Sequence, residues 1–219
     1  MRRNTVLFIC IVTLTAHDAI FVCRKDCIMN TKNTKKPINK TKMLCEAAVF
    51  LALAQILSYI RFYRFPNGGS VDCAMLPIIL FAVRYGTGWG TLTGFVYGLL
   101  QYFLGNGLSI DWTSMLGDYL IAYTALGCGA GLFSRKTYGV FFGTVSGCVL
   151  RFLVHWVVGA VIWGEYMPDT FFGMDMTNEW FYSLLYNGSY MLLCMVVVLV
   201  LFAVLYKPLK KYVTASDLV

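Results

Sequence analysis

The sequence has little charge and lacks paired-cysteine and nucleotide-binding motifs. Of its 219 residues only 13% are charged, while 58% are hydrophobic and the mean hydropathy is +0.66. Such a composition excludes an ordinary soluble domain. The eight cysteines form no CxxC pair and no Cys/His cluster at metal spacing, so we expect neither a metal site nor a disulfide framework. The sequence also contains no G-x-x-x-x-G-K-[S/T] loop, so we expect no ATP site.

Long apolar runs are the dominant feature of the chain. Each is long enough, or nearly so, to cross the hydrocarbon core of a bilayer as a helix. We therefore expect an all-α membrane protein built as a six-transmembrane-helix bundle. The expected spans cover roughly residues 43–60, 71–84, 87–104, 113–133, 138–163 and 179–206.

The distribution of Lys and Arg predicts the orientation of these spans. Basic residues are dense in residues 24–42 and recur after the second, fourth and sixth spans, whereas residues 105–112 contain none. The loop after the fifth span carries only acidic charge. Only Arg61 and Arg64, after the first span, place basic residues in a loop where this alternation predicts none. The positive-inside rule predicts that both termini are cytoplasmic, and it accounts for the net charge of +7 without a nucleic-acid partner.

The first 42 residues do not belong to this bundle. Arg2 and Arg3 precede an apolar run, as in a signal peptide, but His17 and Asp18 interrupt it and no small-residue cleavage site follows. We expect an N-terminal extension over 1–42, in which 1–28 is not part of the mature or true chain and 29–42 is a basic cytoplasmic segment. A membrane substrate-binding domain is expected over 43–212, followed by a cytoplasmic tail over 213–219.

The fifth span carries a stripe of unusual residues. Arg151, His155, Gly159 and Trp163 recur every fourth position, which places them along one helical face. Ionisable side chains inside a membrane helix are costly and usually face the bundle interior or a water-filled cavity. The stripe is a candidate wall of a binding site. The alternatives are a structural histidine, an interfacial tryptophan and an arginine that pairs within the bundle.

Polar and aromatic residues near the predicted outer ends of two other spans complete this candidate site. Asp118, next to Tyr119, either caps a helix or anchors a cationic ligand. In the sixth span Tyr182 begins a tyrosine repeat with a spacing of four, and Asn187 lies within the apolar run. An amide there favours two-sided hydrogen bonding to a heteroaromatic ligand.

Chemistry on the ligand is less well supported than binding. No nucleophile–base pair, phosphate loop or metal set accompanies the candidate site, although an intramembrane enzyme that uses Asp118 and His155 as acid and base remains an alternative. On the first span, Ala48 and Ala52 have the small-xxx-small spacing that lets another helix approach closely. These alanines serve either packing within the bundle or an interface.

Four blocks of the sequence resemble a known family. FPNGGSVDCAMLPIIL, GDYLIAYTALGCGAGLF, RFLVHWVVGAVIW and YSLLYNGSYM are similar, in this order, to the thiamine-specific substrate-binding components (S-components) of energy-coupling factor transporters, the ThiT/YuaJ family. The resemblance covers about residues 43–212. It implies a multi-pass protein of the bacterial cell membrane that captures thiamine outside. It also implies docking on a module of two ATPases and one transmembrane coupling protein.

The resemblance also assigns roles to the candidate residues. Ala48 and Ala52 match the small-residue motif used against the coupling protein, and no cofactor is implied. A related vitamin or precursor, such as hydroxymethylpyrimidine, remains an alternative ligand. The acidic loop after the fifth span predicts that free thiamine is preferred over its phosphates. The thiamine-binding positions implied are Asp118, Tyr119, His155, Gly159, Trp163, Tyr182 and Asn187.

Overall fold

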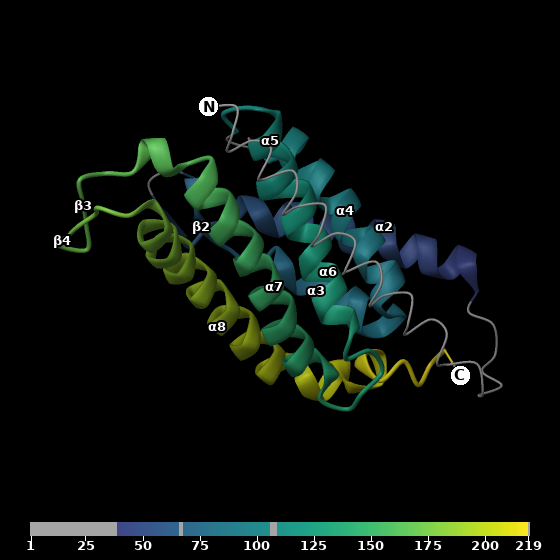
Figure 1. Ribbon diagram of the computed structural model, residues 1–219. Helices are drawn as coiled ribbons and strands as arrows, with labels where there is room; N and C mark the ends of the chain where they lie inside the picture. Colours follow the sequence, from purple (N-terminus) through teal and green to yellow (C-terminus); the bar gives the residue numbers. More distant parts are fainter. Residues whose placement is uncertain (1–38, 66–67, 106–108, 219) are drawn as a thin grey trace. The chain divides into compact units, whose positions relative to one another are not determined.

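The computed structural model describes residues 39–65, 68–105 and 109–218 of the chain, and the expectations for residues 1–38 lie outside this part (Figure 1). The described residues belong to one compact unit, and the predicted all-α, six-helix architecture is confirmed. The fourth helical column consists of α5, η2 and α6 in direct succession. The helices are α2 (Lys40–Tyr59), α3 (Met75–Tyr85), α4 (Thr87–Leu104), α5 (Trp112–Met115), η2 (Leu116–Ile121), α6 (Ala122–Gly131), α7 (Gly139–Val161), the short η3 (Gly164–Tyr166) and α8 (Glu179–Val213).

Three of these helices, α2, α7 and α8, are long and apolar enough to cross a membrane. α2 begins at Lys40, where the side chain of Asn39 accepts hydrogen bonds from the backbone N–H groups of Thr41 and Lys42. α8 continues to Val213, beyond the expected end at residue 206. Asp217 and Leu218, within the tail expected over 213–219, pack against the bundle.

The connections contain two short antiparallel hairpins that the sequence pattern did not predict. β1 (Tyr63–Arg64) pairs with β2 (Ser70–Val71), and β3 (Thr170–Phe171) pairs with β4 (Met174–Asp175). The first hairpin is attached to α8, because the backbone N–H of Gly69 donates to the hydroxyl of Tyr186 at 3.0 Å. This contact brings the loop after α2 over the N-terminal half of α8.

Glycines on α4 allow the fourth column to approach closely. A Cβ atom at Gly94 would lie 2.1 Å from the carbonyl oxygen of Tyr123, and one at Gly98 would lie 2.6 Å from that of Tyr119. Neither distance is possible for a real side chain, so only glycine permits this backbone contact. The contact fixes the position of η2, which carries two of the predicted site residues.

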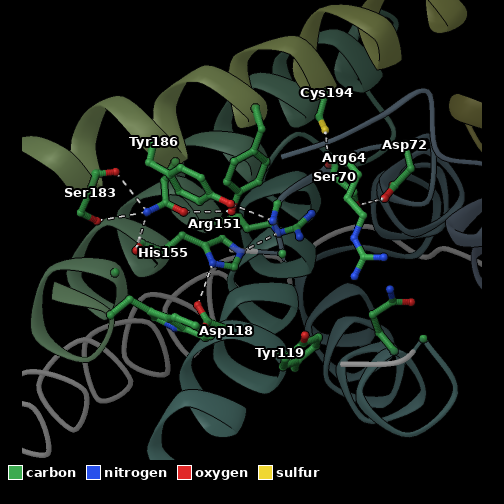
Figure 2. Close-up of a pocket in the computed structure, with 18 of the residues that line it drawn as sticks. Arg64, Ser70, Asp72, Asp118, Tyr119, Arg151, His155, Ser183, Tyr186 and Cys194 are labelled. Carbon is green, nitrogen blue, oxygen red and sulfur yellow. Dashed lines mark hydrogen bonds and ion pairs between the residues drawn. The ribbon is translucent and has the colours of Figure 1, made fainter. Parts of the chain in front are cut away.

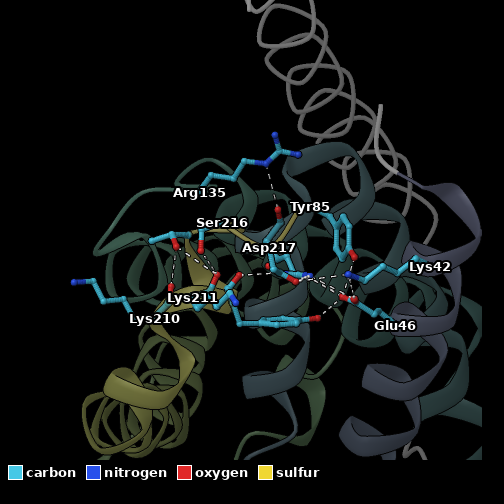
Figure 3. Close-up of polar contacts among 11 residues, drawn as sticks. Lys42, Glu46, Tyr85, Arg135, Lys210, Lys211, Ser216 and Asp217 are labelled. Atoms are coloured by element: carbon cyan, nitrogen blue, oxygen red, sulfur yellow. Dashed lines mark hydrogen bonds and ion pairs between the residues drawn. The ribbon is translucent and has the colours of Figure 1, made fainter. Parts of the chain in front are cut away.

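A dense ionic cluster lies at the end of the bundle where α8 terminates (Figure 3). Its centre is Arg84, whose side chain is fully buried and lies at the end of α3. The guanidinium donates to both carboxylate oxygens of Asp217 at 2.7 Å and to Glu46 at 2.9 Å, and it stacks 3.7 Å from the ring centroid of Tyr212. Lys42 lies at the edge, 3.7 Å from Asp217. We call these five residues the Arg84 cluster.

The Arg84 cluster ties three distant parts of the chain together. Glu46 comes from α2, Arg84 from α3, and Asp217 from the turn after α8. Hydrogen bonds from Arg84 lower the pKa of the Asp217 carboxyl to about 2. Leu218 packs nearby against an apolar group that includes Met43. The end of the chain is therefore part of the bundle.

Candidate ligand-binding site

Five parts of the chain line one pocket, at the end of α8 opposite the Arg84 cluster (Figure 2). These parts are the first hairpin with its flanking residues, the end of α4, the η2–α6 column, α7 and α8. The pocket brings together all seven residues that the sequence singled out for ligand binding. They are Asp118, Tyr119, His155, Gly159, Trp163, Tyr182 and Asn187.

Asp118 lies at the centre of a hydrogen-bond network between helices. Its Oδ1 lies 3.0 Å from Nδ1 of His155, and its Oδ2 accepts from the indole N–H of Trp163 at 2.9 Å. The hydroxyl of Ser114 lies 3.3 Å from Oδ2. The carboxylate is partly exposed to the pocket, with 17% of its side-chain surface accessible. Among the described residues no Lys or Arg forms an ion pair with it, and His155 is the one neighbour in contact that can carry a positive charge.

The neighbours of His155 define its tautomer. Nε of Arg151 can only donate, and it lies 3.3 Å from Nε2 of His155, which must therefore accept. The proton of a neutral imidazole then sits on Nδ1 and is donated to Asp118. His155 thus lies between a carboxylate and a guanidinium and keeps the two apart.

Arg151 lies in the pocket lining. Its guanidinium carbon lies 4.1 Å from the ring centroid of Tyr123, a cation–π contact, and its Nε donates to His155. Within the described part of the chain it has no ion pair with a carboxylate. The sequence left pairing within the bundle open for Arg151, and the partners found are an imidazole and an aromatic face.

Asn187 joins α8 to α7. Its Nδ2 donates to the carbonyl oxygen of His155 at 3.2 Å and to the carbonyl and hydroxyl oxygens of Ser183 at 3.1 Å, and its Oδ1 accepts from Tyr190 at 3.0 Å. The amide is therefore already satisfied by protein groups. Its first role is to position the two helices that form the pocket wall.

Gly159 is the point of closest approach between these helices. A Cβ atom there would lie 2.4 Å from Oγ of Ser183 and 2.7 Å from Nδ2 of Asn187. The sequence placed Gly159 in the candidate wall of the binding site. The structure places side chains of α8 in part of the space beside it, while the residue still contributes to the pocket surface.

Aromatic rings supply the other walls. Tyr182 is buried and packs edge-on against Phe171 of the second hairpin at 5.4 Å between centroids. On the opposite side, Tyr119 packs against Tyr102 at 5.5 Å. Trp163 presents a ring whose N–H is fixed by Asp118. These faces suit stacking and cation–π contact with a flat, cationic ligand.

Asp118 and Tyr119 lie in a π-helical segment, η2, that the sequence did not predict. Such segments occur mostly as short bulges within α-helices and often at functional sites. Residue types carry no strong signal for this backbone pattern. Sequence reasoning therefore found the residues of this helix and missed its geometry.

Several lining residues were not predicted to bind ligand. Arg61 and Arg64 were noted only as exceptions to the charge pattern, and the tyrosine repeat on α8 pointed to Tyr186 and Tyr190 without assigning them a contact. The long-range packing of the first hairpin gave no local signal. The lining residues outside the predicted site include Arg61, Arg64, Gly69, Ser70, Asp72, Gln101, Tyr123, Arg151, Ser183, Tyr186, Tyr190 and Cys194.

Comparison with known proteins identifies the family of this chain. The model of the thiamine transporter protein family (Thia_YuaJ) matches residues 44–214. The chain belongs to this family. It is 34% identical over 187 residues to the thiamine transporter ThiT of Bacillus subtilis, covering 75% of this chain and 94% of that protein. It is 28% identical over 191 residues to ThiT of Lacticaseibacillus paracasei, covering 80% and 92%.

The fold of this thiamine transporter family member is also that of a solved relative. The structure of ThiT from Listeria monocytogenes matches with a TM-score of 0.70 at 22% identity, over 80% of this chain and 98% of that chain. The resemblance to thiamine-specific S-components is thus confirmed, and the protein is a membrane transport protein. On α2 of this family member, Ala48 and Ala52 are exposed on the bundle surface.

Proposed function

We propose that this chain is the high-affinity thiamine-binding subunit of an energy-coupling factor importer and that the pocket around Asp118 binds thiamine. The single observation that carries this proposal is the Asp118 carboxylate, which faces the pocket without a Lys or Arg partner among the described residues. A permanently cationic thiazolium supplies the missing positive charge. Trp163 and Tyr119 supply faces for its rings.

The aminopyrimidine of thiamine suits the polar part of the same site. A carboxylate accepts from an exocyclic amine in a charge-assisted hydrogen bond. Thiamine binding would exchange the bonds that Asp118 makes with His155 and Trp163 for bonds to the ligand, or share them. Either way the carboxylate changes from a solvent-facing group to a fully paired one.

Tryptophan fluorescence tests this proposal directly. Thiamine is titrated into the detergent-purified protein, and saturable quenching is expected at submicromolar concentration because Trp163 contacts the ligand. Trp163→Phe should remove most of the quenching, whereas Trp112→Phe, which changes a side chain with 78% of its surface exposed, should keep it. Asp118→Ala and Trp163→Ala should each weaken binding by at least about tenfold, or about 1.4 kcal/mol. Wild-type affinity in folded Asp118→Ala protein would contradict the site.

Two experiments distinguish the remaining alternatives. One is competition by fragments of thiamine, and the other is chemical analysis of the ligand recovered after binding. If hydroxymethylpyrimidine competes with thiamine at equal concentration, the pocket recognises the pyrimidine alone and the cation is not required. An intramembrane enzyme that uses Asp118 and His155 would return altered thiamine after incubation. We expect chemically unchanged thiamine, because Asp118 and His155 already bond to each other within the protein.

We further propose that both termini are cytoplasmic and that Ala48 and Ala52 form part of the surface that docks on the transmembrane coupling protein. Both alanines are exposed on α2, which is otherwise held in the bundle by Met43, Ala54 and Ser58. Two ATPases of the coupling module would supply the energy. Ala48→Trp should abolish uptake and copurification with the coupling protein while thiamine binding persists; uptake at the wild-type rate would contradict this surface.

A further inference from the structure

The pocket lining contains two arginines that the proposed thiamine contacts do not use. Arg61 and Arg64 flank the start of the first hairpin, and both line the pocket. They are the two residues that run against the positive-inside pattern. Their side chains place positive charge in the lining of a pocket that otherwise suits a cationic ligand.

Arg61 is held in a defined position. Its Nε donates to the carbonyl oxygen of Ser58 at 3.2 Å, and its Nη2 donates to the carbonyl oxygen of Gly105 at 3.1 Å. These bonds neutralise no charge, and Nη1 has no hydrogen-bond partner among the residues that the structure describes. The residue is half-buried. Its guanidinium is therefore positioned before any ligand arrives.

Arg64 ends β1 and has a different environment. It is exposed, and among the residues that the structure describes its side chain makes no hydrogen bond and no ion pair. Figure 2 shows it across the pocket from Asp118. Arg64 is a donor with all of its groups available at the far side of the site.

The charges of the pocket lining do not balance for a simple cation. Among the described lining residues, three guanidinium groups, those of Arg61, Arg64 and Arg151, accompany two carboxylates, those of Asp72 and Asp118. One positive charge is in excess among these groups. A ligand with only a positive charge would enlarge it further. A ligand with a cationic ring at one end and an anion at the other would remove it.

We propose that Arg61 and Arg64 form an anion subsite that binds a phosphate ester on the hydroxyethyl arm of the ligand. The inference rests on the proposed thiamine-binding function. In this arrangement Asp118 takes the cationic rings on one side of the pocket, and the two guanidinium groups take the phosphate on the other. Phosphate oxygens accept several charge-assisted hydrogen bonds from arginine, which is the side chain best suited to that geometry.

This proposal differs from the preference for free thiamine that the acidic loop after the fifth span predicted. The four acidic residues considered there, Glu165, Asp169, Asp175 and Glu179, are exposed and do not line the described pocket. Charges in contact with the ligand outweigh exposed charges at a distance, which salt screens. The pocket lining therefore favours a phosphorylated ligand.

The test compares thiamine with thiamine monophosphate by calorimetric titration of the purified full chain in phosphate-free buffer. Arg64→Gln should raise the ratio of the monophosphate Kd to the thiamine Kd by about tenfold, or about 1.4 kcal/mol. Arg61→Lys keeps the charge but loses the fixed geometry, so it should raise the ratio less. Lys210→Gln is the matched control, since it removes one exposed positive charge at the other end of α8 and should leave the ratio unchanged.

The possible outcomes distinguish a failure of the anion subsite from a failure of the proposed thiamine-binding function. An unchanged ratio in Arg64→Gln overturns the subsite while the thiamine site stands. Wild-type protein that binds neither compound overturns both. Inorganic phosphate is titrated together with thiamine as a third arm. If it increases thiamine affinity as much as the covalent phosphate does, the arginines bind a free anion and the phosphorylated-ligand proposal is overturned.

Discussion

The two ends of the bundle use similar residues in opposite ways. The Arg84 cluster and the pocket each contain an arginine, carboxylates and tyrosines. In the Arg84 cluster, a fully buried guanidinium contacts two carboxylates directly, with N···O distances of 2.7 to 2.9 Å. In the pocket His155 separates Asp118 from Arg151, so neither charge is neutralised by an opposite charge in contact. Paired charges hold the fold together, and separated charges remain available for a ligand.

The largest effect is expected at the Arg84 cluster. Arg84→Met should destabilise the protein by roughly 3 kcal/mol, because it removes the buried guanidinium and leaves Glu46 and Asp217 with the half-exposed Lys42 as their ionic partner. Thermal unfolding in detergent measures this change. Lys210→Met, an exposed change at the same end, is the control and should have little effect. A melting temperature of Arg84→Met within one degree of wild type would show that this end does not depend on ion pairing.

The next effect concerns the helix contact behind the pocket. Gly159→Ala should cost roughly 1–3 kcal/mol of stability, because its Cβ overlaps Ser183 and Asn187. Thiamine affinity should fall with it, since α7 and α8 must separate. Adding Ser183→Ala, which removes the nearest atom, should recover part of both losses.

Gly188→Ala on α8 is the matched control, because its nearest neighbour, Phe152, lies at an ordinary contact distance of 3.7 Å. Equal melting temperatures and affinities for Gly159→Ala and Gly188→Ala would contradict the close contact at Gly159.

At Asp118 we expect binding and stability to respond differently. Asp118→Asn removes the charge but keeps the size and some hydrogen bonds, so stability should change by less than about 1 kcal/mol. Thiamine affinity should nevertheless fall at least about tenfold, as calorimetry would measure. Asp111→Asn is the nearby control: it lies at the N-terminus of α5, outside the pocket lining, and Asn caps helices as well as Asp does. Loss of stability without loss of affinity in Asp118→Asn would reverse the contrast between the two ends.

The sequence predicted the pocket better than it predicted the ionic cluster. The spacing of four that aligns Arg151, His155 and Gly159 is local, and the helical period alone places these residues on one face of α7. Trp163, which the sequence placed on the same helix, lies just beyond the end of α7 at Val161. The partners of Arg84 are 38 and 133 residues away along the chain, and the contact with Asp217 requires a turn after α8 that no pattern predicts. Local periodicity therefore gave the helices and their faces, and long-range contacts remained hidden.

Two features of the site were beyond sequence reasoning for other reasons. The π-helical geometry at Asp118 has no clear residue signature. Arg61 and Arg64 were visible as exceptions to a topological rule, but their position in the pocket depends on the fold of a hairpin. A residue that departs from a general pattern is a good place to look for function, and these two arginines are such a departure.

The smallest effect is expected from pH at the Arg84 cluster. The pKa of Asp217 is lowered to about 2 from a usual value of 3.8, so its stabilising contribution is complete above pH 3.8 and is lost as the pH falls toward 2. Asp217→Asn should cost about 1 kcal/mol at neutral pH, since the carboxylate is partly exposed. The difference in melting temperature between variant and wild type should stay constant from pH 8 to about 5 and shrink below about 4. A difference that stays constant down to pH 2 would mean that Asp217 has a normal pKa in the folded protein and that its pairing with Arg84 is weak, which would remove half of the contrast between the two ends.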